Sequence, residues 1–492
     1  MSRGFYTLFG WTGGYPRDVL LRPLVALSAV AAAVLLASAS HAAPSAAGPR
    51  YVAPAGSGAL FLVSGHGYGH GVGMGQWGAQ GYALQGYTYD QILSAYYPGT
   101  TLGETSTTSI RVLLASGKKK LTISSKQPFT VTDGDGFEHT LPAGKTTFGP
   151  ALKLAVDGGP SEALTPPLTF APASGSNLTL IRPYRGQIVV DAPGKKLRAI
   201  NVLPLEQYLY GVVPAEMPST WLDSALAAQA VAARSYALAN KQAAAPFDVY
   251  ADGRSQAYLG VSAETPAATQ AVDETAGEVL LYAGHVADAL FSSSTGGWTQ
   301  SAADAFGAPG RPYLVSVKDP YDTISPYHDW GPVPVTGKIL GKAVGAVGRV
   351  VDATVKRNAS KRVKTLKVTS RSNGSLHTVS VGGAAVASAF DLRSTWFSVG
   401  VLSLQPPAPN PAITPGTRVT LTGVVRGVRG ALVQKRVKGG TWQRVKAVVP
   451  AATTGAFTVS VKPKVTTDYR LATAKDAAGS VRIRVEGANL GW

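Results

Sequence analysis

Residues 204–240 read PLEQYLYGVVPAEMPSTWLDSALAAQAVAARSYALAN. The apolar spacing at the start of this stretch predicts a short amphipathic helix that ends near Gly211. Pro214 and Pro218 then predict a rigid turn, because proline lacks a backbone donor and restricts the residue before it. An alanine-rich helix is expected after the turn, and its small side chains allow another backbone to approach closely. The stretch therefore places one carboxylate, Glu216, in a tight apolar turn between two helices.

The chemistry expected of Glu216 follows from its neighbours. Ala215 and Met217 are apolar, so the carboxylate between them is expected to be partly desolvated, which raises its pKa. A raised pKa keeps a carboxyl group protonated, and this is the form that a general acid needs. The alternative is structural: Glu216 accepts the free N–H groups at the start of the next helix, which Ser219 is expected to cap.

The runs VVPAEMPSTW and AQAVAARSYAL resemble the signature of the SpoIID/LytB family, the peptidoglycan lytic transglycosylases first known from sporulation stage II protein D. The likeness continues through four further stretches: GRSQAYLG (Gly253 to Gly260), AVDETAGEVLLYAGHVADALFSSSTGGWTQSA (Ala271 to Ala302), PYLVSVKDPYD (Pro312 to Asp322) and LRSTWFSV (Leu392 to Val399). The resemblance covers roughly residues 61–400.

A further block, GHGYGHGVGMGQWGAQGYALQGYTYDQILSAYYPGTTL (Gly65 to Leu102), also resembles the family. In many members this block follows the STWF-like segment, whereas here it precedes the rest. The order resembles a circular permutation, which a domain tolerates when its natural termini lie close together.

The resemblance implies a fold and an activity. The fold is α+β: a β-rich catalytic domain with a few helices, followed by a small all-β sandwich. The activity is cleavage of the bond between N-acetylmuramic acid (MurNAc) and N-acetylglucosamine (GlcNAc), with formation of 1,6-anhydroMurNAc and Glu216 as general acid and base. Glu206 and Asp252 are interpreted as structural, so no second acid stands out. The rivals are a wall-binding protein or amidase modifier, as LytB-type relatives are, and hydrolysis by water, for which no activating base is evident.

The glycine-rich block is expected to be extended or turning from Gly65 to Gly81, because so much glycine disfavours helix. We interpret it as the lining of a substrate groove, in which aromatic rings stack on sugars and polar groups bind hydroxyl or amide groups. The residues expected there are His66, Tyr68, His70, Gln76 and Trp77. The alternatives are a zinc site at the two histidines, for which no third ligand is evident, and a buried hairpin with satisfied histidines.

The matched stretches imply further substrate contacts, which we assign to Arg234, Tyr236, Gln256, Tyr258, Ser294 and Thr295. Some family members hold zinc with Cys and His near the position of Phe291 and Ser292. Because this chain has neither residue there, we expect no metal and no other cofactor. A serine nucleophile is not expected either, since nothing places a base beside the hydroxyls.

The remaining sequence predicts the domain organisation. Residues 108–200 alternate in the strand period and are expected to frame the groove, and Tyr87 to Tyr97 is expected to be helical. The predicted parts are a signal peptide (1–42), a linker (43–60), the Gly/His block (61–103), the rest of the catalytic domain (104–400), a Pro-rich linker (401–416) and a basic β-sandwich (417–492).

The N-terminal segment has arginines, then an apolar run, then small residues before Ala42, which is typical of a secretory signal. An uncleaved membrane anchor is the alternative. Because the chain has no cysteine, disulfides and thiolate metal sites are excluded. We therefore expect a secreted, cell-wall-associated protein, and the Ala, Gly and Arg bias suits a GC-rich Gram-positive bacterium.

Charge is concentrated near the C-terminus. Residues 404–492 hold fourteen cations and three acids, a net +11 of the chain's +18. Outside a cell the available polyanions are wall polymers and anionic lipid, so we interpret the sandwich as a wall-retention module, with an inert spacer as the alternative. The expected partners are peptidoglycan glycan strands, anionic wall polymers and an amidase. Nucleic acid is not expected, since no recognition motif accompanies the charge.

Overall fold

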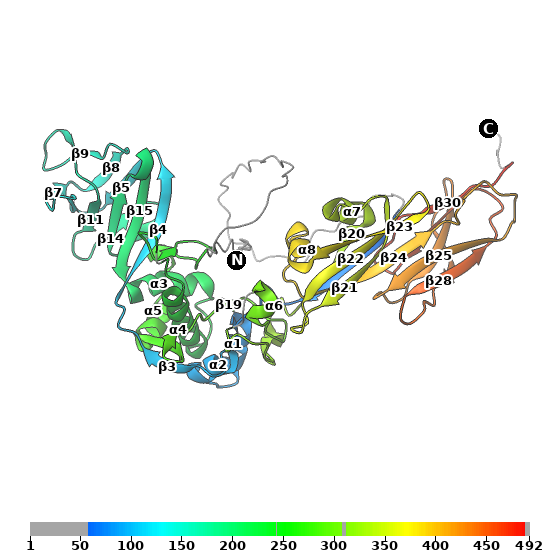
Figure 1. Ribbon diagram of the computed structural model, residues 1–492, viewed down its shortest axis with the longest axis horizontal. Coiled ribbons are helices and arrows are strands. Elements are labelled where there is room, and N and C mark those ends of the chain that lie inside the picture. The colour runs from blue at the N-terminus through cyan, green and yellow to red at the C-terminus, as the bar shows by residue number, and fades with distance from the viewer. Residues whose placement is uncertain (1–57, 243, 308–310, 488–492) are drawn as a thin grey trace, which may run out of the picture.

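The computed structural model describes residues 58–242, 244–307 and 311–487, which form a helical base between two β-rich arms (Figure 1). Strands outnumber helices and gather in several separate sheets, so the predicted α+β class is confirmed. The predicted signal peptide and most of the predicted linker at 43–60 lie outside the described residues. Within the described ranges, no helix is both long and apolar enough to cross a membrane.

The helical base is organised around α4, which is buried along nearly its whole length. Its many alanines have no bulk beyond Cβ, so α1, α2, α3 and α5 all pack closely against it. The helices of the base are α1 (Gln76–Leu84), α2 (Tyr89–Tyr96), α3 (Leu205–Glu216), α4 (Asp223–Ala239), α5 (Pro266–Glu274) and α6 (Ala302–Phe306). A small sheet lies against them, formed by β3 (Thr101–Glu104), β17 (Glu278–Tyr282) and β18 (His285–Val286).

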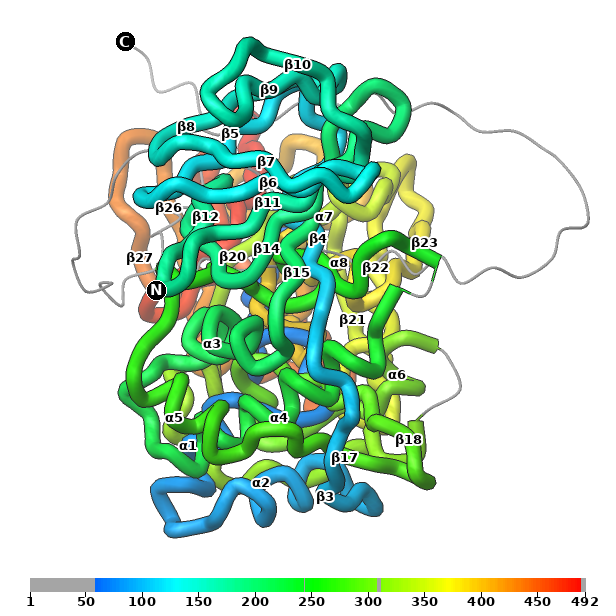
Figure 2. Tube along the Cα trace, turned by 90° about the vertical axis from the view of Figure 1, so that its left-hand side faces the viewer, coloured from blue at the N-terminus to red at the C-terminus, as the bar shows by residue number. Residues whose placement is uncertain are grey.

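The first arm consists of the strands between β3 and α3 together with β16, which follows α4, and Figure 2 shows it above the helices. Its larger sheet has the order β16 (Val249–Tyr250), β4 (Ser109–Lys118), β15 (Leu197–Pro204), β14 (Gln187–Asp191), β11 (Leu168–Pro172), β6 (Phe129–Thr132) and β7 (Glu138–Leu141). Its smaller sheets contain β13 (Pro183–Tyr184), β12 (Leu178–Thr179), β5 (Leu121–Ser125) and β8 (Gly144–Phe148), and the pair β9 (Lys153–Ala155) and β10 (Ser161–Ala163). One continuous hydrophobic core joins this arm to the base. Because β15 leads directly into α3, the arm fixes the helix that carries Glu216.

The second arm is built on a five-stranded sheet in which β1 lies between two strands from the far end of the domain. The order is β20 (Asp329–Thr336), β1 (Leu60–His66), β24 (Phe397–Gln405), β25 (Val419–Arg426) and β28 (Ala456–Val461). A three-stranded sheet and two helices cover it: β21 (Arg349–Arg357), β22 (Val363–Ser372), β23 (Ser375–Gly382), α7 (Gly337–Val344) and α8 (Gly383–Ala389). The Gly/His block thus begins beside the STWF-like segment, although it precedes that segment by more than 300 residues.

The C-terminal strands predicted from the sequence are all present, but they do not form a separate sandwich. β25 and β28 extend the sheet of β1 and β24, and the facing sheet contains β27 (Gln443–Ala447), β26 (Leu432–Val437), β29 (Thr467–Ala472) and β30 (Val481–Ile483). Leu60, Leu62 and Leu402 belong to the same core as these strands. The predicted linker boundary at residue 401 falls inside β24, because this strand continues to Gln405 to complete that core.

The glycine-rich block is extended only in its first part. β2 (Met74–Gly75) pairs with β19 (Phe291–Ser292), and helix α1 then begins at Gln76, so the prediction of extended backbone as far as Gly81 is wrong. The glycines in α1 serve close packing: a Cβ on Gly78 would overlap the Tyr96 hydroxyl. The prediction for Tyr87 to Tyr97 is confirmed by α2, which Thr88 and Gln91 cap.

Two glycines in the block test this packing. Both Gly73 and Gly86 have a positive φ, +70° and +83°, but a Cβ on Gly73 would overlap the carbonyl oxygen of Leu290, whereas Gly86 has nothing within 4 Å. Alanine costs the same backbone strain at both positions. We expect Gly73→Ala to lower the free energy of unfolding by roughly 1–3 kcal/mol more than Gly86→Ala, which is the usual cost of overpacking. Urea denaturation measures both, and equal losses would contradict the packing.

Candidate active site

Glu216 is the last residue of α3, and this helix runs further than the sequence predicts. The predicted end near Gly211 is wrong, because α3 continues through Pro214. Proline costs one intrahelical hydrogen bond but keeps a helical φ, so it is tolerated in this last turn. Met217, which precedes Pro218, is extended with φ −131° and ψ 140°, and the helix ends there.

The next helix is capped differently from the prediction. α4 begins at Asp223 after Leu222, and no side chain of its own N-cap residue binds its free N–H groups, so the predicted Ser219 cap is wrong. Instead, Gln80 of α1 accepts a hydrogen bond from the Leu222 N–H through Oε1 at 3.0 Å. Glu216 is likewise not engaged as a cap, since its carboxylate binds elsewhere.

Glu216 is a partly exposed residue, and its carboxyl group, which is largely desolvated, has one backbone partner. Its Oε1 accepts a hydrogen bond from the N–H of Ala257 at 2.7 Å. Burial raises the pKa of Glu216, and the Ala257 N–H, which favours the charged form, opposes this rise. The net effect is a raised pKa, as the sequence predicted. A carboxyl group with a raised pKa can donate a proton to a molecule that reaches it.

Three residues that were predicted to contact the substrate are instead buried in the helical base. Gln76 donates through Nε2 to the backbone oxygen of Glu216 at 3.0 Å and to Oε1 of Gln229 at 3.3 Å. Gln256 accepts a hydrogen bond from the Tyr208 hydroxyl at 3.1 Å. Gln76, Gln256 and Tyr236 are all buried, and the first two hydrogen-bond residues of α3, while Tyr236 packs against Phe291.

A groove of about 830 Å³ lies beside this segment, although Glu216 is not itself among the lining residues. Ala215 and Ala257 line it, and both lie next to Glu216, one in sequence and one through the hydrogen bond. Its walls are residues 113–118 of β4, residues 181–184 and the loop 251–259, which includes the predicted contact Tyr258. As expected for the first arm, β4 therefore frames the groove.

The polar groups of the groove were not found from the sequence. Lys118, Arg182 and Arg254 line it, and Asp252 is the only carboxylate among the described lining residues. Asp252 accepts from the Arg254 guanidinium at 2.7 Å, which holds the pKa of Asp252 below its usual range. These residues come from three separate segments that carry no common motif, so only the fold brings them together.

Other predicted contacts are structural. Arg234 is fully buried, and its guanidinium pairs with Glu206 and donates to the carbonyl of Glu278 at 2.9 Å. This confirms the structural interpretation of Glu206 and removes Arg234 from the groove. Trp77 remains partly exposed and packs edge to face against Trp221, with ring centroids 4.7 Å apart.

Ser294 and Thr295 lie in a buried network instead of on a substrate surface. The Ser294 hydroxyl donates to Asp322 at 2.9 Å, and the Thr295 hydroxyl donates to Asp319 at 2.7 Å. Asp322 also accepts from the N–H groups of residues 295 and 296 and pairs with His328 at 2.8 Å. Burial, together with the charge of Asp322, raises the pKa of Asp319 to about 7.

The two histidines of the glycine-rich block have different partners and do not converge. His66 pairs through Nδ1 with Asp329 at 2.6 Å, on the second arm. His70 accepts a hydrogen bond from the Val72 N–H at 3.0 Å, and burial lowers its pKa to about 4, so its imidazole is neutral near pH 7. Tyr68 contacts Tyr327, with ring centroids 5.0 Å apart. The block therefore contributes to two places, one near Glu216 and one on the second arm.

Comparison with known proteins places this geometry in context. A family model described as "SpoIID: Stage II sporulation protein" matches residues 193–282, which include Glu216 and Ala257. Stage II sporulation protein D of Bacillus subtilis is 38% identical over 149 residues, which are 26% of this chain and 42% of that protein. The Amidase enhancer of the same organism is 40% identical over 114 residues, 23% of this chain and 15% of that protein.

An uncharacterized protein of Brachyspira hyodysenteriae is 33% identical over 216 residues, which are 42% of this chain and 57% of that protein. The chain thus matches between about a seventh and somewhat over half of the length of these relatives. No solved structure matches the chain significantly.

The Asp319 network predicts a specific pH dependence of stability. In the folded chain the pKa of Asp319 lies near 7 instead of 3.8, so the folded state binds its proton more tightly than the unfolded state does. The free energy of unfolding should therefore fall as the pH rises from about 4 to about 7, by at most about 1.4 kcal/mol per pH unit from this group.

Asp319→Asn keeps a neutral acceptor for Thr295 but has no carboxyl proton to lose. The free energy of unfolding of this variant should therefore fall less between pH 4 and 7, and the variant should gain stability relative to the unmodified chain as the pH rises. Denaturation curves at several pH values measure it, and Asp135→Asn at an exposed site is the control. A constant difference between the Asp319→Asn variant and the parent chain across pH 4 to 7 would contradict the raised pKa.

Proposed function

The chain belongs to the SpoIID/LytB family, and from this premise we propose that it is a secreted, cell-wall-associated lytic transglycosylase that cleaves the MurNAc–GlcNAc bonds of peptidoglycan. The observation that carries the proposal is the raised pKa of the Glu216 carboxyl group, together with a large groove that its neighbours Ala215 and Ala257 line. The relatives named Stage II sporulation protein D and Amidase enhancer support a function in the cell wall.

A single carboxyl group suffices for this reaction. Glu216 first donates its proton to the glycosidic oxygen as the bond from C1 of MurNAc to that oxygen breaks. The C6 hydroxyl of the same MurNAc then forms the new bond to C1, and its proton passes to the Glu216 carboxylate, which restores the acid. Because the attacking hydroxyl is part of the substrate, its effective concentration is very high, and no second carboxylate is needed to activate water.

The Ala257 N–H has two effects on this cycle. It binds Oε1, so the proton to be donated belongs on Oε2, the other oxygen of the carboxyl group. It also stabilises the carboxylate that exists between the two proton transfers, since a hydrogen bond to a charged acceptor is stronger than one to a neutral acceptor. Burial and this hydrogen bond act in opposite directions, and together they allow Glu216 to lose and regain its proton.

The groove offers a substrate both apolar and cationic surface. Ile181 presents exposed apolar surface, and Lys118, Arg182 and Arg254 present positive charge, whereas the rings of Tyr184 and Tyr258 are buried beneath the wall. Apolar side chains pack on the apolar faces of sugars, and cations attract the acidic groups of a muramic-acid polymer. Asp252 is tied to Arg254, so it orients this cation in the groove wall.

The second candidate function is an amidase modifier that binds the wall without cutting it. The likeness to the Amidase enhancer favours it, since that match is the highest in identity of the three relatives described above. A binding protein would use the groove without proton transfer by Glu216. The two functions therefore differ in whether the carboxyl proton of Glu216 matters.

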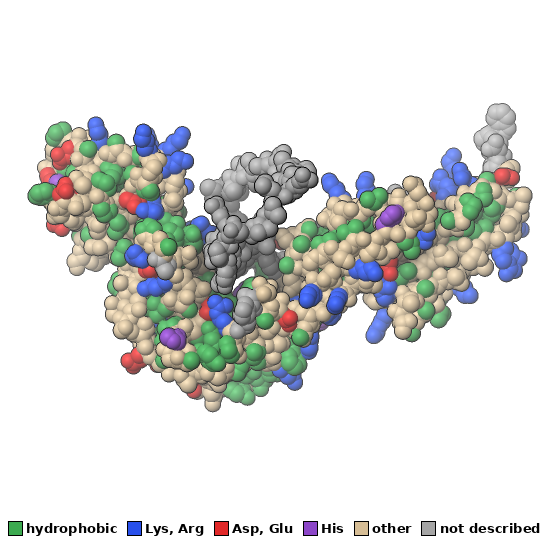
Figure 3. Space-filling view, viewed as in Figure 1, with side chains coloured by type: hydrophobic (Ala, Val, Ile, Leu, Met, Phe, Trp, Pro, Cys, Tyr) green, Lys and Arg blue, Asp and Glu red, His purple; other side chains and the backbone are tan. Residues whose placement is uncertain are grey.

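The C-terminal strands support retention at the wall. The sheet of β27, β26, β29 and β30 carries Arg436 and Arg470 over the ring of Trp442, at 4.5 and 4.0 Å from its centroid. Strand β27 is exposed along its whole length and contributes Arg444 and Lys446. In Figure 3 blue side chains are spread along this arm as far as its end. Such a surface suits a phosphate-bearing wall polymer.

The first prediction here concerns catalysis. Glu216→Gln cannot donate a carboxyl proton, so we expect release of 1,6-anhydroMurNAc ends from purified peptidoglycan to fall at least about 100-fold, the usual contribution of a general acid. Asp135→Asn, which changes an exposed carboxylate outside the groove, should retain most of the activity. Mass spectrometry of the released fragments measures both.

The pH profile adds a check on the same residue. The protonated form starts the reaction, so activity should fall as the pH rises through the raised pKa of Glu216. Hydrated reducing ends in place of anhydro ends would indicate hydrolysis. If the unmodified chain and Glu216→Gln both sediment with the wall but release nothing, the binding function replaces the catalytic one.

The second prediction concerns retention. The double variant Arg444→Glu and Lys446→Glu reverses two exposed charges on β27, so less of it should sediment with sacculi that carry anionic polymers. The loss should shrink as salt is raised, because salt screens charges. Lys145→Glu with Lys153→Glu makes the same charge change on the first arm and is the control. Equal retention of both double variants would contradict a binding surface on β27.

A further inference from the structure

The groove beside the Glu216 segment runs along a free sheet edge. Strand β16 pairs with β4 only at Val112 and Leu113. Beyond them, residues 114–118 of β4 have β15 on one side and no described strand on the other. The opposite wall of the groove is the loop 251–259, which follows directly on β16, so the groove lies where a further strand would continue the sheet. An edge of this kind leaves backbone N–H and C=O groups without a partner strand.

The length of this edge fits a short peptide. A strand advances about 3.4 Å per residue, so residues 114–118 span roughly 15 Å. An extended peptide of four or five residues has amide groups at the same spacing and can pair with the edge as an added strand does. Such pairing uses main-chain groups, so it does not depend on which side chains the peptide carries. The volume of the groove, about 830 Å³, is of the size that ligand sites usually have.

The charge of the groove wall favours an acidic peptide. Lys118 and Arg182 line the groove, and neither forms an ion pair with a carboxylate of the described residues. Arg254 is paired with Asp252 at 2.7 Å. Three cations and one acid give the wall a net charge of +2. Two cations are therefore left to attract the carboxylates of a ligand.

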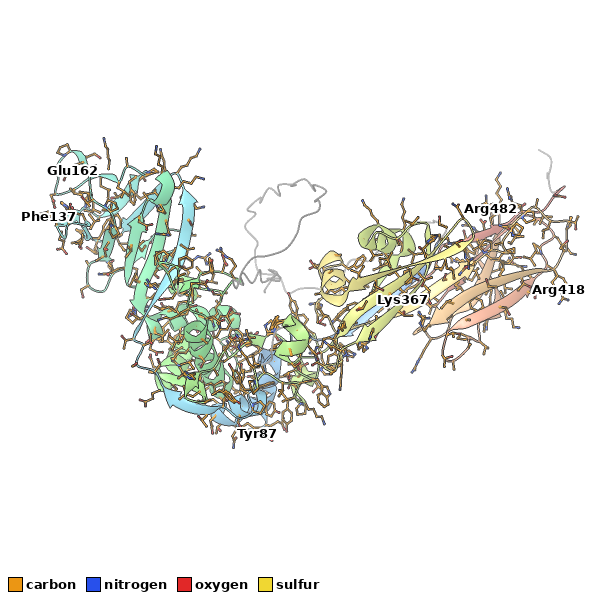
Figure 4. The ribbon with its side chains drawn as sticks, in the orientation of Figure 1. Tyr87, Phe137, Glu162, Lys367, Arg418 and Arg482 are labelled. Atoms are coloured by element: carbon orange, nitrogen blue, oxygen red, sulfur yellow. The ribbon has the colours of Figure 1, made fainter. Side chains whose placement is uncertain are left out.

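Acidic side chains of the same arm lie away from this wall. Glu138 belongs to β7, which is at the opposite edge of the sheet from β16 and β4. Figure 4 shows Glu162 and Phe137 at the tip of the arm. Charge is thus separated within the arm, and its positive part includes the free edge of β4.

The groove also reaches the neighbours of the catalytic residue. Ala215 and Ala257 line it, and the Ala257 N–H binds the Glu216 carboxyl group. In the proposed reaction Glu216 acts at C1 of MurNAc, and MurNAc is the sugar whose lactyl group carries the peptide stem in peptidoglycan. A stem on the reacting sugar would therefore extend from a point close to this groove.

We propose that the groove binds the peptide stem of the reacting MurNAc unit: the free edge of β4 pairs with the amides of the stem, and Lys118 and Arg182 bind its carboxylates. The proposal rests on the proposed function for the identity of the polymer. It assigns a substrate class, glycan that still carries its peptides, in preference to stripped glycan. In stripped glycan the lactyl carboxylate can still meet one cation, but the amides that pair with β4 are gone.

The test compares two ligands by calorimetry, with the full chain carrying Glu216→Gln. The first is a GlcNAc–MurNAc disaccharide that bears its peptide stem, and the second is the same disaccharide after an amidase has removed the stem. We expect the first to bind at least about tenfold more tightly, because two or three net hydrogen bonds to the peptide are worth at least that factor. The free stem peptide should compete with the first ligand. Equal affinities for the two disaccharides, or no binding of the first, would overturn the proposal.

A pair of double variants tests the groove wall. Lys118→Ala with Arg182→Ala removes two cations that line the groove, so the disaccharide with its stem should bind at least about tenfold more weakly, the loss of hydrogen bonds to charged groups. Lys119→Ala with Lys120→Ala removes two exposed cations next to the groove that do not line it, and is the matched control. Unchanged melting temperatures check that both variants fold. Full affinity in the first double variant, or an equal loss in the control, would overturn the assignment.

Cleavage by the unmodified chain separates this proposal from the proposed function. Release of anhydro ends is measured on native peptidoglycan and on peptidoglycan stripped by an amidase, and faster release from the native glycan supports both proposals. Equal or faster release from the stripped glycan would overturn the peptide site and leave the enzyme standing. Release from neither glycan, with stem-dependent binding retained, would overturn the proposed function and leave the peptide site standing.

Discussion

The hydrogen bonding of β1 between β20 and β24 is the constraint on which the rest of the structure depends. This strand comes first among the described residues, yet it lies inside a sheet whose neighbours are hundreds of residues away. Register is strict here, because a slip by one residue would exchange the side chains that the strand contributes to the two cores on its two faces. Beyond His66 the same segment continues into the base. There Met74 pairs with Phe291 in a short parallel ladder, and the Gln76 side chain donates a hydrogen bond to the backbone oxygen of Glu216. One segment thus joins the second arm to the catalytic end of α3.

The buried cation Arg362 strengthens that junction. Its guanidinium donates to the carbonyls of residues 295, 298, 299 and 360, so it ties the second arm to the loop that carries Thr295. Burial lowers its pKa to about 9, and four carbonyl partners compensate for the loss of water. Arg362 binds the carbonyl groups of the loop that carries Thr295, and the Asp322 carboxylate binds N–H groups of the same loop. The glycine-rich block runs alongside this fixed loop and therefore has little freedom. The position of Gln76, and with it the end of α3, follows from this packing.

Sequence patterns predicted the elements better than their contacts. Alternation located the strands of both arms, and helical spacing located α2, because these signals are local. Glu216 was found through a motif, and its raised pKa followed from apolar neighbours. The patterns failed where a contact from elsewhere in the chain decided the outcome. Gly78 is helical in α1, where the Tyr96 hydroxyl packs so closely that no Cβ would fit. They also failed at Pro214, which remains helical because the last turn of α3 tolerates it. Ser294 and Thr295 were taken for surface hydroxyls, since nothing nearby in the sequence marks Asp319 and Asp322 as their partners.

The glycine-rich block shows why residue lists taken from a motif mix different roles. The block contributes His66 to the second arm, where it pairs with Asp329, and Gln76 to the base, where it binds the backbone oxygen of Glu216. Gln76 is buried and positions the backbone, while His66 stays accessible beside Asp329. Conversely, Lys118 and Arg182 have no motif, but β4 and the segment after β12 bring them into one groove with Ala215 and Ala257, the neighbours of Glu216. Motifs therefore mark residues that lie close in sequence, whereas the charged wall of the groove exists only in the folded chain.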